Sequence, residues 1–372
     1  MRVMLIAGEA SGDLAGAGVV RALKRRDPGC DLYGIGGDKM QAEGMQLVYH
    51  VRELAFMGFW EVLQHLPLVR SVERTMEALL AARRPDVVVL IDYPGFNLRF
   101  ARTVKKSGMK VVYYIGPQVW AWNPGRVKKM KGCIDKMLVV FPFEVETYRR
   151  EGIDVEFVGH PLLETLAEPQ GRTEFCTRYG LNPGLPVLGL FPGSRRQEIE
   201  RIFPSMLGAA RMLHASAAVQ VAVGVASVLE FDFVRSFLRG DFPVRLIQHA
   251  TYDVMKNSDV AVVTSGTATL ETACFQTPMV VVYRTSWLTY FIGRMLIRVG
   301  MIGLVNIVAG RKLVPELIQG AMTPRSLASE VLGLLEHEDR RKEMSRELAA
   351  VKERLGTAGA SERVADAILS FA

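Results

Sequence analysis

Short apolar runs alternate with amphipathic stretches along the chain, and this alternation predicts parallel α/β structure. In the first half the apolar runs contain almost no polar residue, which is typical of strands covered by helices on both faces of a sheet. Helical periodicity follows them, as in residues 14–26 and 69–82. The strands predicted for this half are 3–7, 31–35, 86–91, 111–115 and 136–140.

The same pattern restarts after residues 161–186, a stretch rich in Pro, Gly and charge that predicts a linker. The later strands are predicted at 187–191, 220–223, 244–247, 260–263 and 279–283, and residues 325–372 are helical by period. We therefore expect two Rossmann-like, doubly wound domains, 1–165 and 175–345, facing each other across a cleft. Helices in 346–372 are expected to pack back on the first domain or on a partner subunit.

Composition supports two substantial cores and an acidic partner. The chain has 372 residues, of which 49% are hydrophobic and 23% charged, so disorder is excluded and each half can bury a core. The formal net charge is +7. This charge favours a phosphorylated substrate, an anionic membrane surface or nucleic acid, although a solvated basic face without a partner gives the same count.

Metal, redox and membrane-spanning classes are disfavoured. The four cysteines are scattered, as in proteins of a reducing compartment, and neither H-x-x-x-H nor D-x-D occurs, so no cofactor and no metal site is predicted. The N-terminus starts like a signal peptide, but a buried first strand explains it better because Glu9 and Asp13 follow. Residues 287–309 are apolar but contain Arg294 and Arg298, which argues against a span and leaves surface attachment open.

Two loops of the second half suit an anion. Ser265, Gly266 and Thr267 lie between an apolar strand and a helix, where backbone N–H groups and the helix dipole favour a phosphate. Glu271, one turn into that helix, is placed to accept hydrogen bonds from ribose hydroxyls. The alternative is an ordinary N-cap followed by a solvated glutamate.

The second anion loop contains Gly193, Ser194 and Arg195 and also follows a predicted strand. A guanidinium there can neutralise a diphosphate and stabilise the charge that grows on it as it leaves. Surface arginines after a turn are common, which is the alternative. Two such loops at one sheet favour a nucleotide site.

The corresponding loop of the first half carries carboxylates instead. Glu9, Ser11 and Asp13 lie in a sequence that is neither G-x-G-x-x-G nor a P-loop, and they suit sugar hydroxyls better than pyrophosphate. The alternative is a plain turn in which Asp13 caps a helix.

Asp92 is the candidate general base. It directly follows a buried strand, and Pro94 limits the conformations that the chain can take there. An aspartate at that edge can remove a proton from an attacking hydroxyl. Glycosidic hydrolysis needs a second carboxylate to protonate the leaving group, whereas a nucleoside diphosphate leaves as a stable anion. The alternative is a turn residue that satisfies its own loop.

Two apolar segments lie outside the predicted central strands. One contains Phe56, Met57, Phe59 and Trp60, and the other contains Trp120 and Trp122 just before a basic cluster at 126–131. Such aromatic groups dock at lipid headgroups, stack on nucleic-acid bases or belong to an ordinary core.

Eight motifs, spread in order over nearly the whole chain, carry a resemblance. They are residues 8–13 (GEASGD), 34–37 (GIGG), 91–97 (IDYPGFN), 118–122 (QVWAW), 158–162 (VGHPL), 191–195 (FPGSR), 264–271 (TSGTATLE) and 306–319 (NIVAGRKLVPELIQ). In these motifs the chain resembles the bacterial lipid-A-disaccharide synthases, which are GT-B glycosyltransferases. Two positions differ from the family's usual pattern: Val305 stands where Pro is usual, and Tyr93 where a small residue is frequent.

The resemblance implies transfer of 2,3-diacylglucosamine from UDP to 2,3-diacylglucosamine 1-phosphate, with inversion, without a metal, at the cytoplasmic face of the inner membrane. It implies that Asp92 is the essential aspartate and that Arg195, Glu271 and Asn306 belong to the UDP site. The first domain would bind the acceptor through Glu9 and Ser11, with its acyl chains toward residues 56–63 and 120–122. The C-terminal helices would exchange between protomers in a homodimer.

Three alternatives remain at this stage. A UDP-N-acetylglucosamine 2-epimerase shares the fold type, but its substrate has no acyl chains, so it does not account for the two apolar segments. A nicotinamide-dependent oxidoreductase is disfavoured by the missing G-x-G-x-x-G. A non-catalytic basic protein would bind membranes or nucleic acid through its charge alone.

Overall fold

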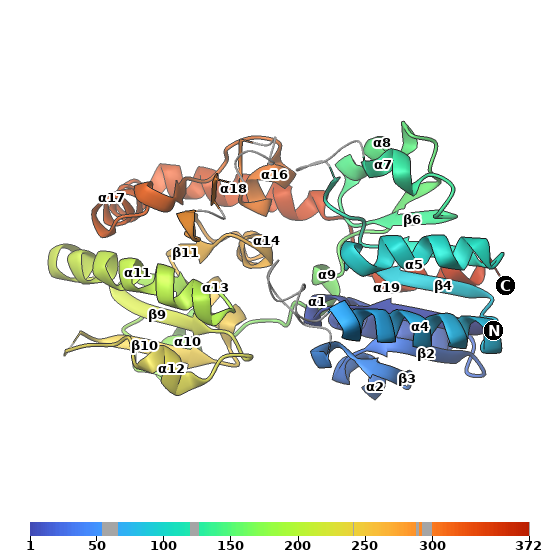
Figure 1. The fold of residues 1–372 in the computed structure, drawn as a ribbon. Helices are drawn as coiled ribbons and strands as arrows, with labels where there is room; N and C mark the ends of the chain where they lie inside the picture. The colour runs from blue at the N-terminus through green and yellow to red at the C-terminus, as the bar shows by residue number, and fades with distance from the viewer. Residues whose placement is uncertain (54–65, 120–125, 241, 288–289, 292–299, 372) are drawn as a thin grey trace. The chain divides into compact units, whose positions relative to one another are not determined.

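The structure, a computed structural model, describes residues 1–53, 66–119, 126–240, 242–287, 290–291 and 300–371. These residues form two compact units (Figure 1). Unit 1 comprises residues 1–164 and 355–372, and unit 2 comprises residues 165–354. Each unit is described below by itself.

Unit 1 is built on a parallel sheet whose order, within the described residues, is β3-β2-β1-β4-β5-β6-β7. Its central strands are almost wholly apolar and fully buried, as β4 shows along its whole length, because helices cover both faces. The strands are β1 (Arg2–Ala7), β2 (Asp31–Gly36), β3 (Gln46–His50), β4 (Val87–Ile91), β5 (Lys110–Tyr114), β6 (Lys136–Val139) and β7 (Val155–Phe157).

The helices of unit 1 include one from the far end of the chain. α19 packs against α1, and Ser361 donates a backbone hydrogen bond of 2.8 Å to Glu164 there. The helices are α1 (Ala10–Arg26), α2 (Asp38–Ala42), α4 (Leu66–Arg83), α5 (Pro94–Lys106), α7 (Arg126–Met130), α8 (Pro142–Arg149), α9 (Leu162–Thr165) and α19 (Ala360–Leu369), with a 3₁₀ turn η1 (Val51–Glu53).

Unit 2 repeats the topology. Its parallel sheet has the order β10-β9-β8-β11-β12-β13 in the described residues, so the strand order reverses between β8 and β11 as it does between β1 and β4. The strands are β8 (Val187–Phe191), β9 (Gln220–Val225), β10 (Val244–Gln248), β11 (Val260–Thr264), β12 (Met279–Tyr283) and β13 (Glu316–Ile318). These two sheets confirm the predicted pair of doubly wound domains.

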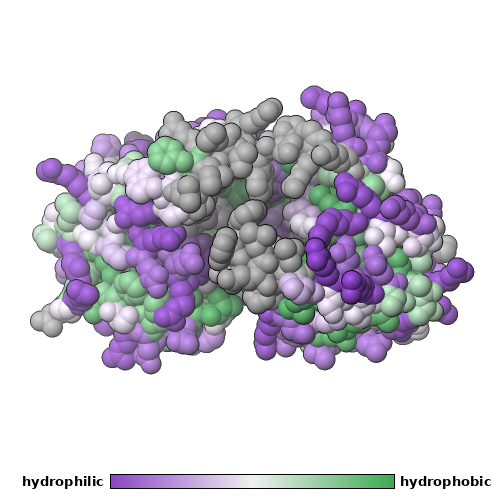
Figure 2. Space-filling view, in the orientation of Figure 1, coloured by the Kyte–Doolittle hydropathy of each residue, from purple (hydrophilic) through white to green (hydrophobic). Residues whose placement is uncertain are grey.

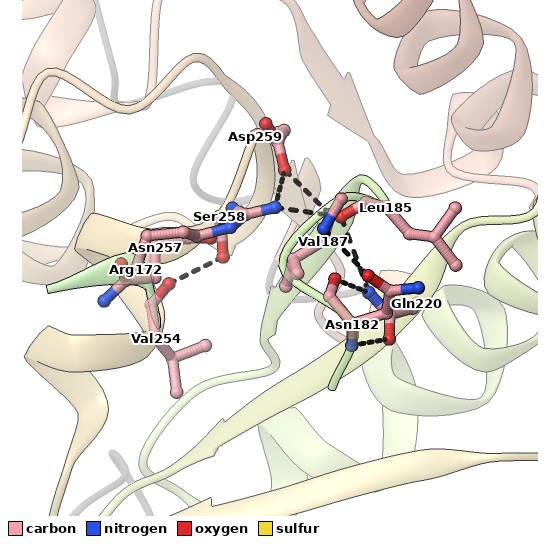
Figure 3. A network of polar contacts seen from close by, with 10 residues as sticks. Arg172, Asn182, Leu185, Val187, Gln220, Val254, Asn257, Ser258 and Asp259 are labelled. Atoms are coloured by element: carbon pink, nitrogen blue, oxygen red, sulfur yellow. Dashed lines mark hydrogen bonds and ion pairs between the residues drawn. The ribbon is translucent and has the colours of Figure 1, made fainter. Parts of the chain in front are cut away.

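Helices surround this second sheet. They are α10 (Arg172–Tyr179), α11 (Arg196–Ala217), α12 (Phe231–Arg235), α13 (Thr251–Asn257), α14 (Thr267–Cys274), α16 (Leu304–Ala309), α17 (Pro324–Glu336) and α18 (Glu338–Arg354), with a 3₁₀ turn η2 (Gln319–Ala321). The stretch before β8 is fixed to the sheet by polar contacts (Figure 3). Arg172 donates to Asp259 at 3.0 Å, and the same carboxylate accepts from the backbone of Val187 at 2.8 Å. Much of the predicted linker is therefore part of unit 2.

The structure differs from the sequence prediction at the C-terminal segment and at three strands. The returning segment was expected from residue 346, but α18 continues to Arg354 and buries Met344, Leu348 and Val351 in unit 2, so the return begins at Leu355. The strands β3, β7 and β13 were not predicted. All three are short and only partly buried, so they lack the apolar run that marks a central strand.

The described surface in Figure 2 carries many hydrophilic side chains on both units, as expected when the apolar residues lie in the two sheets. Among the described helices, none combines the length and the apolar character that crossing a bilayer requires.

Candidate functional site

The first candidate site lies where the strand order of unit 1 reverses, since parallel sheets bind ligands outside the carboxyl ends of their strands at this point. β1 and β4 are paired, with Ala7 opposite Ile91. The loops that follow these strands are therefore neighbours, and they contain Glu9 and Asp92. Burial, with a smaller contribution from the Glu9 carboxylate, raises the pKa of Asp92 from 3.8 to about 6.

Asp92 is held in an unusual backbone conformation. Its φ is 48° and that of Tyr93 is 47°, so two successive residues with side chains are left-handed. The Asp92 carbonyl accepts hydrogen bonds from Tyr113 Oη at 2.6 Å and from Asn97 Nδ2 at 2.8 Å. Its N–H donates to the Tyr114 carbonyl at 2.9 Å. Strained turns that their surroundings fix in this way are frequent at functional sites.

Tyr93 also shapes the neighbouring loop. A Cβ atom at Gly8 would come within 2.1 Å of the Tyr93 ring, so the absence of a side chain at Gly8 is what lets the ring lie there. The Tyr93 ring therefore packs over the first turn of the site.

The carboxylates of the first loop have different surroundings. Asp13 is buried, and its carboxylate accepts from the N–H groups of Gly37, Met40 and Lys39 at 2.7, 3.0 and 3.2 Å, respectively. Asp13 therefore caps α2, whereas the alternative from the sequence had it cap the helix that follows its own loop, α1, in which it actually lies. Glu9 is half-buried at the start of α1, and Ser11 is exposed. Of the two carboxylates, Glu9 is the one beside Asp92.

In unit 2 the corresponding reversal lies between β8 and β11, which are paired with Phe191 opposite Val263. Ser265 is fixed on two sides: its N–H donates to the Val282 carbonyl at 2.9 Å and its hydroxyl to the Ile302 carbonyl at 2.8 Å. Gly266 has φ 152°, and α14 begins at the exposed Thr267. This places the first N–H groups of α14 at the carboxyl edge of the sheet.

Thr264 adds an unpaired group next to this turn. It is 3% exposed, and its Oγ1 has no hydrogen-bond partner among the described residues. Buried hydroxyls are normally paired, so such an atom at the end of β11 calls for an explanation.

The loop after β8 contains a feature that the sequence analysis missed. The backbone N–H groups of Ser194 and Arg195 donate to Glu198 Oε2 at 3.0 and 3.3 Å, and Arg195 Nη1 lies 3.2 Å from Glu198 Oε1. A Cβ at Gly193, where φ is 115°, would lie 2.3 Å from the same carboxylate. Glu198 thus already occupies the backbone N–H groups of a loop whose guanidinium was predicted to neutralise a diphosphate.

A signal for this arrangement was present in the sequence. A glutamate three residues after the residue that precedes a helix is the N3 half of a capping box, and Glu198 stands in that relation to Arg195. The Arg195 side chain remains 58% exposed, so its guanidinium is accessible to a ligand.

Glu271 and Asn306 differ in whether their side chains are free to bind a ligand. Burial raises the pKa of Glu271, and a long 3.5 Å hydrogen bond from Tyr252 Oη opposes this. Asn306 is fully buried: its Nδ2 donates to Val314 and Glu316, and its Oδ1 accepts from the N–H groups of Leu313 and Val314. Asn306 therefore positions the 313–316 loop and has no free polar atom for a ligand.

Glu316, which carries no signal in the sequence that marks it as a site residue, continues this arrangement. It accepts from the N–H groups of Ile302 and Gly303 at 3.1 and 2.9 Å as well as from Asn306 at 2.8 Å. The predicted acceptor contacts Phe56, Met57, Phe59, Trp60, Trp120 and Trp122 lie outside the described residues.

Comparison with known proteins covers both units. Residues 3–368 match the family described as "Lipid-A-disaccharide synthetase". The lipid-A-disaccharide synthase of Syntrophus aciditrophicus is 46% identical over 366 residues, 98% of this chain and 96% of the relative. That of Geobacter sulfurreducens is 44% identical over 372 residues, 100% of this chain and 97% of the relative.

Solved structures support the fold. A UDP-N-acetylglucosamine 2-epimerase from Neisseria meningitidis, bound to UDP-GlcNAc, superposes with a TM-score of 0.67 at 13% identity and 100% coverage of both chains. The calicheamicin glycosyltransferase CalG4 gives 0.63 at 17% identity, covering 100% of this chain and 97% of that one. At these identities the likeness establishes the GT-B fold alone. The family match and the full-length relatives go further: the chain belongs to the lipid-A-disaccharide synthetase family and is a glycosyltransferase of lipid A biosynthesis.

Proposed function

We propose that the enzyme transfers 2,3-diacylglucosamine from UDP to the 6-hydroxyl of 2,3-diacylglucosamine 1-phosphate. The acceptor oxygen forms a bond to the anomeric carbon from the face opposite the leaving group, the bond between that carbon and the diphosphate breaks, and UDP leaves. The hydroxyl proton passes to Asp92. The products are the β-1,6-linked disaccharide 1-phosphate and UDP.

The observation that carries this proposal is the state of Asp92. A general base works best when its pKa lies near the working pH, and Asp92, with a pKa of about 6, is largely ionised at neutral pH yet more basic than an ordinary aspartate. Its backbone is fixed by Tyr113 and Asn97. An ordinary turn residue needs neither feature.

Unit 2 is proposed to bind the donor. The start of α14 and the exposed Arg195 guanidinium suit a diphosphate, which is an anion that needs several donors. The unpaired Thr264 hydroxyl offers one more donor to the same group. Glu271 is proposed to accept from the ribose hydroxyls, and Asn306 to support the site from behind through Glu316.

The acceptor is proposed to bind unit 1 near Glu9 and Ser11. Because both substrates carry acyl chains, we propose that the enzyme attaches peripherally to the cytoplasmic face of the inner membrane, where its formal charge of +7 favours anionic lipids. Co-sedimentation with anionic and with neutral vesicles tests this. Equal binding to both, or to neither, would contradict the role assigned to the charge.

Exchange of α19 between two protomers is proposed as the route to a dimer. The link that precedes α19 contains Gly356 and Gly359 with φ of 87° and 95°, and a short hinge of this kind permits exchange of an end helix. Light scattering on the full chain checks the mass. A monomer at every protein concentration tested would refute the exchange.

The decisive experiment compares the wild type with Asp92→Asn and with Asp38→Asn, whose exposed carboxylate lies elsewhere in unit 1. With both lipid substrates and EDTA present, we expect the wild type and Asp38→Asn to release disaccharide and UDP. Asp92→Asn should lose about a hundredfold or more in kcat while its affinity for UDP stays the same. Wild-type turnover by Asp92→Asn would remove Asp92 from this role, and a 2-epimer as product would favour the epimerase alternative.

A further inference from the structure

An aromatic cluster on unit 2 is exposed without an obvious structural reason. It comprises Trp287, Tyr290 and Phe291, and Tyr290 N–H donates to the Ser286 carbonyl at 2.9 Å. Trp287 is 61% exposed and Phe291 58%, and their ring centroids lie 5.9 Å apart. The Tyr290 and Phe291 rings lie 6.0 Å apart. Large exposed aromatic groups that pack on one another commonly mark a binding surface.

The chain that carries this cluster starts and ends at the proposed phosphate site. Ser265 N–H bonds to the carbonyl of Val282, near the end of β12, and Ser265 Oγ bonds to the carbonyl of Ile302, just before α16. Both ends of the excursion are thus tied to one residue of the loop before α14. Trp287 is five residues from Val282, so it lies within about 17 Å of that end.

Both ends are also braced. Thr285 exchanges two hydrogen bonds with the Gln319 side chain, at 2.8 and 3.1 Å. At the other end Glu316 accepts from the N–H groups of Ile302 and Gly303. Because Thr285 is fixed two residues before Trp287, the aromatic cluster is kept near the site for the anionic part of the donor.

We propose that Trp287, Tyr290 and Phe291 form a subsite for the acyl chains of the sugar donor. This inference rests on the proposed function, which puts the donor diphosphate beside Ser265. The donor joins an anionic diphosphate and two apolar chains through a single sugar, so its site needs a polar and an apolar surface near one another. The cluster supplies the apolar surface, and its tie to Ser265 supplies the proximity.

Binding measurements without the acceptor test the subsite independently of catalysis. Calorimetry would give the Kd of UDP and of UDP-glucosamine donors that bear two short acyl chains of increasing length. For the wild type, Kd should fall by up to about fourfold for each added methylene that becomes buried. In the Trp287→Ser/Phe291→Ser variant this dependence should flatten, so that the longest donor binds about tenfold or more weakly, while the Kd of UDP stays the same.

Met212→Ser is the matched control, since Met212 is 45% exposed on α11 of the same unit, far along that helix from Arg195. It should behave as the wild type, and thermal melting should show all variants folded because each removes an exposed side chain. An unchanged chain-length dependence in the double variant would overturn the subsite. So would loss of vesicle binding with that dependence intact, which would make the cluster a membrane contact. If UDP alone fails to bind the wild type, the donor site of the proposed function falls, and this inference with it.

Discussion

Replacing Asp92 by Asn should stabilise the protein at neutral pH even though it removes most of the turnover. The folded-state pKa of Asp92 is raised from 3.8 to about 6, so the folded state holds this proton more tightly than the unfolded chain does. Between these two pH values the unfolded chain binds fewer protons, and the free energy of unfolding therefore falls as pH rises. Above pH 7 this loss of unfolding free energy is complete. The Asp92→Asn variant does not suffer it, because its side-chain amide does not ionise.

The size of the effect follows from the shift. Somewhat over two pKa units, at 1.36 kcal/mol each, correspond to about 3 kcal/mol. Asn also tolerates the left-handed φ of 48° at this position. We therefore expect Asp92→Asn to unfold at higher urea concentration at pH 7.5, with a gain of about 2 to 3 kcal/mol that vanishes near pH 4.

Unit 1 can be followed separately. Trp287 is the one tryptophan in unit 2, so in a Trp287→Phe background the tryptophan fluorescence comes from unit 1 alone. Urea unfolding with and without Asp92→Asn in that background, at a series of pH values, gives the difference directly. A difference that does not change between pH 4 and 7.5, or an Asp92→Asn variant that is less stable at pH 7.5, would refute a raised pKa at Asp92.

Three further changes test the surroundings of the two candidate sites. Glu9→Gln should move the acidic limb of the kcat/KM profile to lower pH, but not as far as 3.8 because burial is the larger cause of the shift; an unmoved limb would exclude the Glu9 contribution. Asn97→Ala should lower kcat about tenfold or more by releasing the Asp92 carbonyl, and a KM effect alone would contradict this. Glu198→Gln should tighten UDP binding severalfold, measured by calorimetry, because the carboxylate no longer competes for the N–H groups of Ser194 and Arg195. The same change should lower the free energy of unfolding by about 1 kcal/mol through the weakened cap. Glu200→Gln, at an exposed position of the same helix, is the control.

The central strands could be predicted because nearly all of their residues are buried, so their sequences are almost uninterrupted apolar runs. Val87–Ile91 and Val260–Thr264 are short apolar runs that lie fully buried in the middle of a sheet. The edge strand Gln46–His50 has an exposed first residue and half-buried ones after it, and Glu316–Ile318 contains only three residues. Such strands form because a neighbour is available for pairing, which local pattern does not reveal.

The candidate site was predictable at the level of loops but not of contacts. The position of Asp92 at the end of a buried strand follows from the sequence, and so does the loop at Ser265. That Asp13 caps α2 depends on a contact with Gly37, 24 residues away, and that Asn306 is wholly enclosed depends on the fold of the 313–316 loop. Long-range hydrogen bonds of this kind decide whether a polar residue faces a ligand or the protein.

The two units share a strand order but differ in charge where that order reverses. In unit 1 the carboxylates of Glu9 and Asp92 disfavour an anion there, whereas in unit 2 a helix start and Arg195 favour one. Glu198 changes the energetics on the second side, because its carboxylate already binds the N–H groups of Ser194 and Arg195. A diphosphate that binds these N–H groups must first displace the Glu198 carboxylate. The affinity for UDP therefore reflects the difference in binding free energy between the diphosphate and this carboxylate. This is why removing the charge of Glu198 is expected to strengthen UDP binding, while the same substitution at Glu9 should leave UDP affinity unchanged and act instead on acceptor binding and on the pH dependence of turnover.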